Sequence, residues 1–230
     1  MHTMLSKENV LVFIGLLMST SCFAQSRIEF LKELETKEVK PIVFWSDEQI
    51  DQKVDSVLQL MTLDEKIGQM YEITGAGGNV AELGDVNDVT DKKVFEQKGL
   101  VGMSLGTSGA VACYRAQKYA VEKTRLRIPL HFNFDVVHGF KTVFPINLAL
   151  SGTWDPELVE KATRISAIEA TVSGLTITNA PMIDVCRDPR WGLITEGCGE
   201  DPYLASEMAK AYVKGFQGEN LADKNTLIVP

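Results

Sequence analysis

Short apolar runs alternate with longer amphipathic stretches over most of the chain. Three runs have the length and composition of buried strands, at 100–105 (LVGMSL), 130–135 (LHFNFD) and 175–181 (LTITNAP), and a fourth, TLIV, occupies 226–229. Strands that alternate with helices in this way favour a parallel sheet whose faces are covered by helices. We therefore expect an α/β fold, in which residues 182–185 (MIDV) extend the third strand or lead out of it.

Local signals mark where the helices begin. Two segments match the capping box, in which a hydroxyl accepts from a backbone N–H and a side chain three residues later reaches back: Ser46 with Gln49, and Thr62 with Glu65. Asp155 and Asp201 each precede a proline, the pairing of an N-cap with proline at the first helical position. These signals predict four helices, the last of them running to about Gln217, and a fifth spans Ala110 to about Arg125.

Apolar side chains recur at helical spacing in two of these predicted helices. We expect one buried stripe in the first helix, made of Ile50, Val54, Val57, Leu58 and Met61. In the helix after Asp155 we expect one apolar face, made of Leu158, Val159, Ala162 and Ile165. Residues 74–91 contain several glycines and no period, which predicts a surface loop.

The first 24 residues have the layout of a secretory signal peptide. Lys7 precedes an apolar run from Val10 to Met18, and small residues lead to Ala24, after which cleavage is expected. A retained N-terminal anchor and lipid attachment at Cys22 are the alternatives. The prediction is a secreted or periplasmic protein with a lead-in at 25–46.

Composition limits the class of protein. A hydrophobic fraction of 45% suits a packed core, while a net charge of −8 without basic runs argues against a nucleic-acid partner. Beyond the N-terminus no apolar run approaches the ~20 residues of a membrane span. Cys113, Cys186 and Cys198 are interpreted as buried thiols, with a Cys186–Cys198 disulfide as the alternative.

Asp135 is the candidate binding residue. It closes the second predicted strand, at the end where parallel α/β enzymes place their sites, and its carboxylate can accept bonds from hydroxyl groups. Alternatively, Asp135 caps the following turn and His138 is a satisfied core histidine. A metal bound by His131, Asp135 and His138 fits no fixed ligand spacing, so we expect no metal site.

The charged loop at 187–202 (RDPRWGLITEGCGEDP) follows the third strand and reaches the same edge. We interpret Arg187, Asp188, Glu200 and Asp201 as a salt-bridged loop with Trp191 packed beneath it, and leave the role of Arg190 open. The chain contains no nucleophile elbow, phosphate loop, zinc-protease motif or dinucleotide fingerprint.

Three motifs in order resemble one known family. The stretches are VDSVLQLMTLDEKIGQM, RLRIPLHFNFDVVHGFKTVFPINLALSGTWDPELV, and APMIDVCRDPRWG followed by EGCGEDPYLASEMAKAYVKGFQG. Over about residues 47–230 they resemble the N-terminal domain of glycoside hydrolase family 3, in its periplasmic β-glucosidase and β-xylosidase branch. The resemblance implies a TIM-type β/α barrel and retaining hydrolysis of terminal β-glucosides or β-xylosides, without a cofactor.

The resemblance also implies roles for single residues. Asp135 looks like the aspartate that binds sugar hydroxyls. Leu193 stands where the family has a second sugar contact, an arginine, so we expect a weakened subsite, and Cys198 replaces a residue that is usually aromatic.

The resemblance places the nucleophile and the acid/base in later parts of the family's chain, so we assign no catalytic residue. We expect residues 47–230 to form roughly the first half of a barrel. By themselves these residues are not expected to hydrolyse glycosides. The expected partner is a β-linked glucoside or xyloside oligosaccharide. The alternatives are a non-catalytic sugar-binding remnant and a truncated product without function. A Schiff-base lyase would need a lysine at a strand end, which the predicted strands lack. The sequence specifies no oligomeric state.

Overall fold

The computed structural model describes residues 45–74, 98–221 and 223–230. Its elements are, in chain order, α2 (Asp47–Leu60), α3 (Leu63–Gln69), β1 (Glu72–Thr74), β2 (Met103–Leu105), α5 (Ala110–Lys123), β3 (His131–Phe134), α6 (Asn147–Ser151), α7 (Pro156–Val172), β4 (Ile177–Thr178), the 3-10 helix η1 (Ile194–Glu196) and α8 (Pro202–Gln217). The predicted signal peptide, residues 25–44 of the lead-in and residues 75–91 of the predicted loop lie outside the described residues. No helix within the described ranges has both the length and the apolar character of a membrane crossing.

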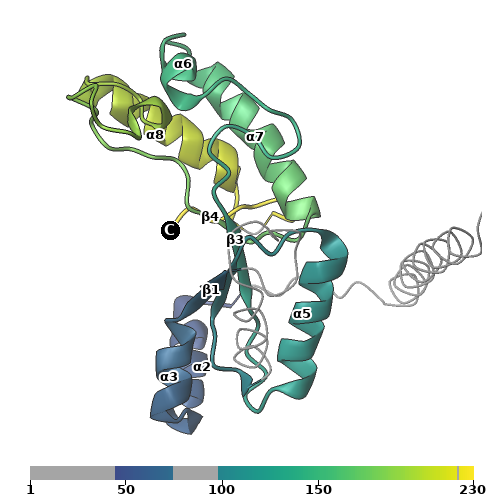
Figure 1. Cartoon of the computed structure of the whole chain (residues 1–230). Helices are drawn as coiled ribbons and strands as arrows, with labels where there is room; N and C mark the ends of the chain where they lie inside the picture. Colours follow the sequence, from purple (N-terminus) through teal and green to yellow (C-terminus); the bar gives the residue numbers. More distant parts are fainter. Residues whose placement is uncertain (1–44, 75–97, 222) are drawn as a thin grey trace, which may run out of the picture. The chain divides into compact units, whose positions relative to one another are not determined.

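The four strands form one parallel sheet in the order β1-β2-β3-β4 (Figure 1). Every neighbouring pair is parallel, and the register aligns Thr74, Leu105, Asn133 and Ile177 across the sheet. Neighbours in space are therefore also neighbours in sequence, as in successive strands of a β/α barrel. The predicted α/β fold, as one arc of a TIM-type barrel, is confirmed.

The strands themselves differ from the prediction in number and length. The three-residue β1 was not predicted, and the third predicted strand contains only the two residues of β4. Residues 182–185 lead out of the sheet rather than extending it. TLIV contributes a single parallel bridge, between Ile228 and Ile177. In this bridge Thr178 N donates to the Ile228 carbonyl at 2.9 Å, and Ile228 N donates to the Thr176 carbonyl at 3.0 Å.

The predicted helix starts are confirmed. Ser46 and Thr62 each form a complete capping box. Asp155 accepts from the backbone N–H of Leu158 at 3.0 Å. Asp201 accepts from the N–H groups of two residues in the first turn of α8. These caps satisfy amide groups that the first turn of a helix leaves without an intrahelical partner.

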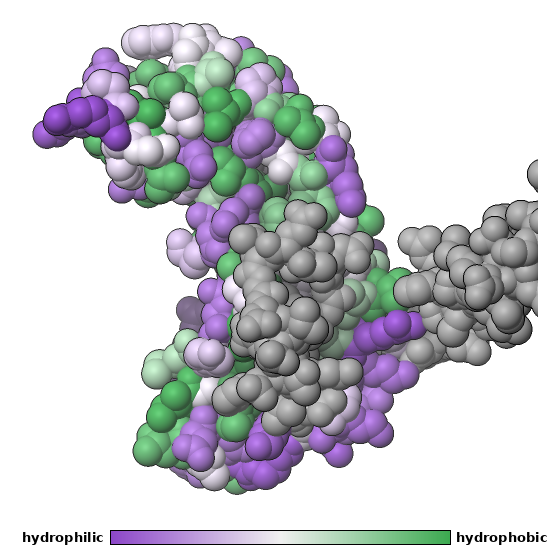
Figure 2. All heavy atoms as spheres, in the orientation of Figure 1, coloured by the Kyte–Doolittle hydropathy of each residue, from purple (hydrophilic) through white to green (hydrophobic). Residues whose placement is uncertain are grey.

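The predicted burial of the α2 stripe is wrong. Ile50, Val54 and Leu58 remain 45%, 49% and 42% exposed, and no residue of α2 is buried. Figure 2 shows hydrophobic residues on the visible surface at the lower left, over α2 and α3. Helical periodicity defines an apolar face, but burial requires a second element to cover it, and no described helix or strand packs extensively on α2.

Helices α7 and α8 pack along each other (Figure 1). The face of α7 that is buried includes Val159 and Ala162 as predicted, but Leu158 and Ile165 are each 45% exposed. Small and hydroxylated residues take their place, because α8 approaches too closely for larger side chains. A Cβ atom on Gly215 would lie only 2.6 Å from the carbonyl oxygen of Glu160.

Two contacts fix the chain that enters β3. The side-chain amide of Gln117, on α5, accepts from Leu130 N at 2.7 Å and donates to Leu130 O at 3.1 Å. Arg125, just after α5, donates to both carboxylate oxygens of Glu65 on α3. Together they hold the start of β3 against two different helices, and so determine where the end of that strand lies.

Candidate functional site

Asp135 directly follows β3, and Asn179 directly follows β4. Because the carboxyl ends of parallel strands lie at one edge of a sheet, these two side chains meet there. Nδ2 of Asn179 donates to Oδ1 of Asp135 at 2.9 Å, and both side chains are exposed. The Asp135 carboxylate thus lies at the exposed edge of the sheet and bonds to Asn179. It does not cap the turn that follows Asp135.

A buried hydroxyl fixes the backbone beneath this pair. Oγ1 of Thr178 accepts from Val136 N and from Ala180 N, both at 3.2 Å, and Thr178 is fully buried. Asn179 N also donates to the carbonyl of Phe134 at 3.3 Å. The two strand ends are therefore joined on either side of Asp135, which limits how far its main chain can move.

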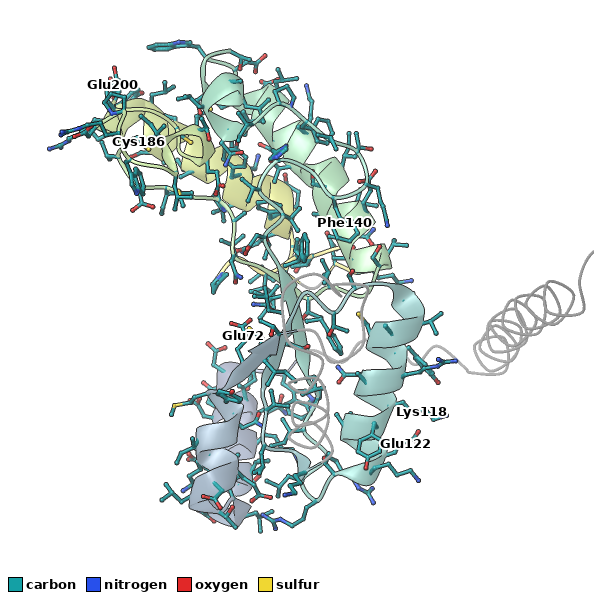
Figure 3. All side chains as sticks on the ribbon, viewed as in Figure 1. Glu72, Lys118, Glu122, Phe140, Cys186 and Glu200 are labelled. Carbon is teal, nitrogen blue, oxygen red and sulfur yellow. The ribbon has the colours of Figure 1, made fainter. Side chains whose placement is uncertain are left out.

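Asn133 connects this pair to the first strand. It is only 1% exposed, and its Nδ2 donates to Oε1 of Glu72 at 2.5 Å and to Oδ1 of Asn179 at 3.4 Å. Figure 3 labels Glu72, on β1. Two carboxylates and two amides thus form one connected group, which we call the edge cluster: Glu72, Asn133, Asp135 and Asn179.

One buried atom of the edge cluster lacks a partner among the described residues. Oδ1 of Asn133 is buried and accepts no hydrogen bond from any described residue. A buried acceptor left unsatisfied costs about 1–3 kcal/mol, and such groups in native proteins call for an explanation.

Sequence reasoning identified Asp135 but missed the other three members of the cluster. A signal existed for Asn133, because residues two apart on a strand share a face, and Asn133 precedes Asp135 by two. Asn179 follows the next predicted strand. Glu72 had no signal, because β1 itself was not predicted.

The two histidines near Asp135 make other contacts. Nδ1 of His138 lies 3.0 Å from Phe144 O, and Phe144 N donates back to His138 O at 2.8 Å. His131 is exposed, with Nδ1 3.3 Å from Oγ1 of Thr176. Among residues 45–74, 98–221 and 223–230, no three His, Cys, Asp or Glu side chains gather into a metal-binding group.

The predicted salt-bridged loop at 187–202 is found only in part: Asp188 pairs with Arg190, whereas Arg187 and Glu200 form no ion pair with another described residue. Arg190 donates to both carboxylate oxygens of Asp188, and this contact lowers the pKa of Asp188. Asp201 serves as the N-cap of α8. Trp191 is 36% exposed and so is not buried beneath the loop as predicted; its N–H donates to the carbonyl of Asp188 at 3.1 Å.

Leu193 lies at the N-terminal end of η1 and is 44% exposed. Its carbonyl accepts from Glu196 N at 3.0 Å, and the Glu196 carbonyl in turn accepts from Nδ2 of Asn147 at 2.8 Å. The position is well defined by its backbone, but the side chain offers neither donor nor acceptor.

The three cysteines of the described region are buried free thiols, as interpreted from the sequence. Burial raises the pKa of Cys113 to about 11 and also raises that of Cys198. Figure 3 labels Cys186, in the loop that precedes α8. A neutral, buried thiol is a poor nucleophile, so Cys113 and Cys198 are unsuited to covalent catalysis.

The edge cluster therefore provides hydrogen-bond acceptors and oriented donors at an open strand edge. A carboxylate with a free oxygen, next to fixed amides, suits a ligand that carries several hydroxyl groups.

Comparisons with known proteins agree with this chemistry. The family model described as "Glycosyl hydrolase family 3 N terminal domain" matches residues 62–226. The chain is 40% identical to a periplasmic beta-glucosidase of Salmonella typhimurium over 77% of its own length and 22% of that protein. It is 33% identical to a beta-xylosidase of Formosa agariphila, over 80% of this chain and 21% of that one.

A solved structure shows the same relationship. The beta-glucosidase of Listeria innocua in complex with glucose superposes with a TM-score of 0.67 at 39% identity, covering 77% of this chain and 26% of that chain. The same enzyme, as a D270A mutant, has been solved with laminaribiose. The chain spans about a fifth of the length of the Salmonella typhimurium and Formosa agariphila relatives.

Proposed function

Because this chain belongs to glycosyl hydrolase family 3 and matches the N-terminal domain of that family, we propose that it binds the terminal sugar of a β-glucoside or β-xyloside. The relatives that support this substrate class are beta-glucosidases and a beta-xylosidase. Glucose and laminaribiose are bound by the Listeria innocua enzyme, which shares its fold.

The observation that carries the proposal is the position of Asp135. It stands at the exposed carboxyl end of β3, and Asn179 occupies one of its carboxylate oxygens at 2.9 Å. The other oxygen is available to accept hydrogen bonds from sugar hydroxyls, and a bond to a charged acceptor is stronger than one between neutral groups. Asp135 would thereby fix the orientation of the sugar ring.

The reaction that this binding serves is hydrolysis with retention. Retaining glycosidases use two carboxyl groups about 5–5.5 Å apart, one as the nucleophile and one as acid and then base. We propose that residues 47–230 supply sugar binding to such a site. On their own they would bind the sugar without hydrolysing the glycoside.

Leu193 sets the expected strength of this binding. The family resemblance implies an arginine at this position, and a leucine supplies none of its five N–H donors. A hydrogen bond to a charged group contributes about 1.5–3 kcal/mol, so binding by this chain would be weaker than binding by a relative that has the arginine.

We also propose that the protein is exported, with residues 1–24 removed and residues 25–46 leading into the barrel region at 47–230. The name of the Salmonella relative, a periplasmic enzyme, supports this localisation. N-terminal sequencing of the protein from a periplasmic fraction would give residue 25 as the first residue. A lipid on Cys22, or an intact N-terminus, would contradict it.

Calorimetry with glucose on the full chain tests the binding proposal. We expect weak binding by the wild type and its loss in Asp135→Asn. Asp64→Asn, which removes a similar exposed charge from α3, is the matched control and should bind as the wild type does. Equal affinity for the wild type and Asp135→Asn would contradict the assignment.

A parallel assay with an aryl β-glucoside tests the proposal that the chain alone is inactive. Turnover that disappears in Asp135→Asn would show that these residues hydrolyse the glycoside by themselves. A chain without a cooperative thermal transition would instead favour a product without function.

A further inference from the structure

The hydrogen bonds of the edge cluster have a defined direction. Nδ2 of Asn133 contacts Oε1 of Glu72 and Oδ1 of Asn179, and both of those atoms can only accept. Turning the Asn133 amide over would place its oxygen against a carboxylate oxygen. The donor side of Asn133 is therefore fixed by its neighbours.

The same argument fixes Asn179. Its Oδ1 accepts from Asn133, so its Nδ2 faces Asp135 and donates to Oδ1 of that carboxylate. The reversed amide would place oxygen against the Asp135 carboxylate and nitrogen against nitrogen. Asn133 thus selects the orientation in which Asn179 offers a donor to Asp135.

Burial differs along this series of bonds. Asn133 is 1% exposed and held in the sheet, whereas Asn179 and Asp135 are exposed. An exposed carboxylate on its own samples several rotamers. The buried amide of Asn133 fixes the orientation of the Asn179 amide, and Asn179 in turn holds the carboxylate of Asp135.

We propose that Asn179 is a positioning residue for Asp135, and that Asn133 orients Asn179 for this task. The inference rests on the proposed sugar-binding function of Asp135. It gives a role to the buried amide of Asn133, whose Nδ2 faces Asn179. It also assigns the two oxygens of Asp135: Oδ1 is held by Asn179, and Oδ2 binds the sugar.

A double-mutant cycle on the full chain tests this role, with glucose affinity measured by calorimetry. Asn179→Ala should weaken binding about threefold to tenfold, the effect of one hydrogen bond to an ionised group that acts indirectly. In the Asp135→Glu background, where the carboxylate is longer by one methylene and no longer meets Asn179, the same change should have no effect. A role confined to stability would give equal losses in both backgrounds.

Asn179→Asp supplies a second measurement with almost no change in shape. It places a carboxylate beside Asp135, so glucose binding should fall further than in Asn179→Ala, and raising the salt concentration should recover part of that difference. Asn225→Ala is the matched control, because Asn225 is an amide bonded to Thr171 outside the edge cluster. It should leave glucose affinity unchanged.

The outcomes separate the two proposals. A wild-type chain that binds no glucose overturns the proposed function and the positioning role with it. A wild type that binds glucose, with Asn179→Ala binding equally well or losing the same factor in both backgrounds, overturns the positioning role alone.

Discussion

The ion pair between Glu65 and Arg125 should be a principal stabilising contact at the start of β3. Nε of Arg125 donates to Oε1 at 2.8 Å and Nη2 donates to Oε2 at 2.5 Å, while Nη2 also reaches the carbonyl of Leu60 at 2.8 Å. Glu65 is only 7% exposed. Replacing Arg125 with methionine keeps most of the aliphatic stem but removes every one of these donors.

The expected loss follows from the exposure of the two partners. Two hydrogen bonds between charged groups would contribute about 3–6 kcal/mol if both groups were buried. The side chain of Arg125 is 55% exposed, and water screens the pair from that side. We therefore expect Arg125→Met to lower the free energy of unfolding by about 2 kcal/mol, which lowers the Tm by roughly 4–8 °C in a chain of this size.

The effect should depend on pH in a defined direction. The hydrogen bonds from Arg125 are the main cause that lowers the pKa of Glu65 from 4.5 to about 2. A carboxylate with a lowered pKa in the folded state stabilises the fold above its unfolded pKa, and this stabilisation disappears as the pH falls toward the folded value. The difference between wild type and Arg125→Met should therefore be complete at pH 7 and smaller at pH 3.

Thermal unfolding followed by circular dichroism at these two pH values measures both effects. Lys161→Met is the matched control, because Lys161 pairs with Glu157 at 3.7 Å with both side chains largely exposed. Such a pair contributes about 0.5 kcal/mol or less. Equal losses in the two variants, or a difference for Arg125→Met that is as large at pH 3 as at pH 7, would refute the reasoning.

Three further predictions concern packing, sugar affinity and thiol reactivity. Gly215→Ala should destabilise the fold by about 1–2 kcal/mol in denaturant unfolding, because its Cβ would lie 2.7 Å from Cβ of Thr163, whereas Gly192→Ala, with open space around it, should not; equal effects would contradict the packing. Leu193→Arg should tighten glucose binding about tenfold or more in calorimetry, and unchanged affinity would argue against a role for this position. Cys113, whose pKa is raised to about 11, should resist iodoacetamide at pH 8 until the chain is unfolded, and stability should fall as the pH rises from 9 toward 11; rapid labelling of the native protein would contradict this.

Features that depend on neighbouring residues were predictable from the sequence. The capping boxes at Ser46 and Thr62 and the proline-marked start at Asp155 all occur where predicted, because cap and amide lie within three residues of each other. The alternation of strands and helices was sufficient to predict the parallel fold. The end of the second strand made Asp135 a candidate, and the family resemblance selected it over the alternative that it caps the following turn.

Features that depend on distant segments were not predictable. The predicted burial of Ile50 is wrong because periodicity does not show whether another element covers a helix face. The hydrogen bonds of Asn133 to Glu72 and Asn179 depend on the register between separate strands. The sequence separation is 61 positions for Glu72 and 46 positions for Asn179. The strand that carries Glu72 has only three residues, too few to show an alternating pattern.

The two hydrogen bonds between Gln117 and the backbone of Leu130 limit which substitutions position 117 can tolerate. The side-chain amide of Gln117 pairs with both backbone polar groups of Leu130: its oxygen accepts from the N–H and its nitrogen donates to the carbonyl. Glutamate has almost the same shape but offers no donor when ionised. A single-base codon change or slow deamidation of Gln117 would therefore replace the hydrogen bond to the Leu130 carbonyl with a repulsive contact between two oxygen atoms. Position 117 should thus tolerate fewer substitutions than its half-buried place on α5 suggests.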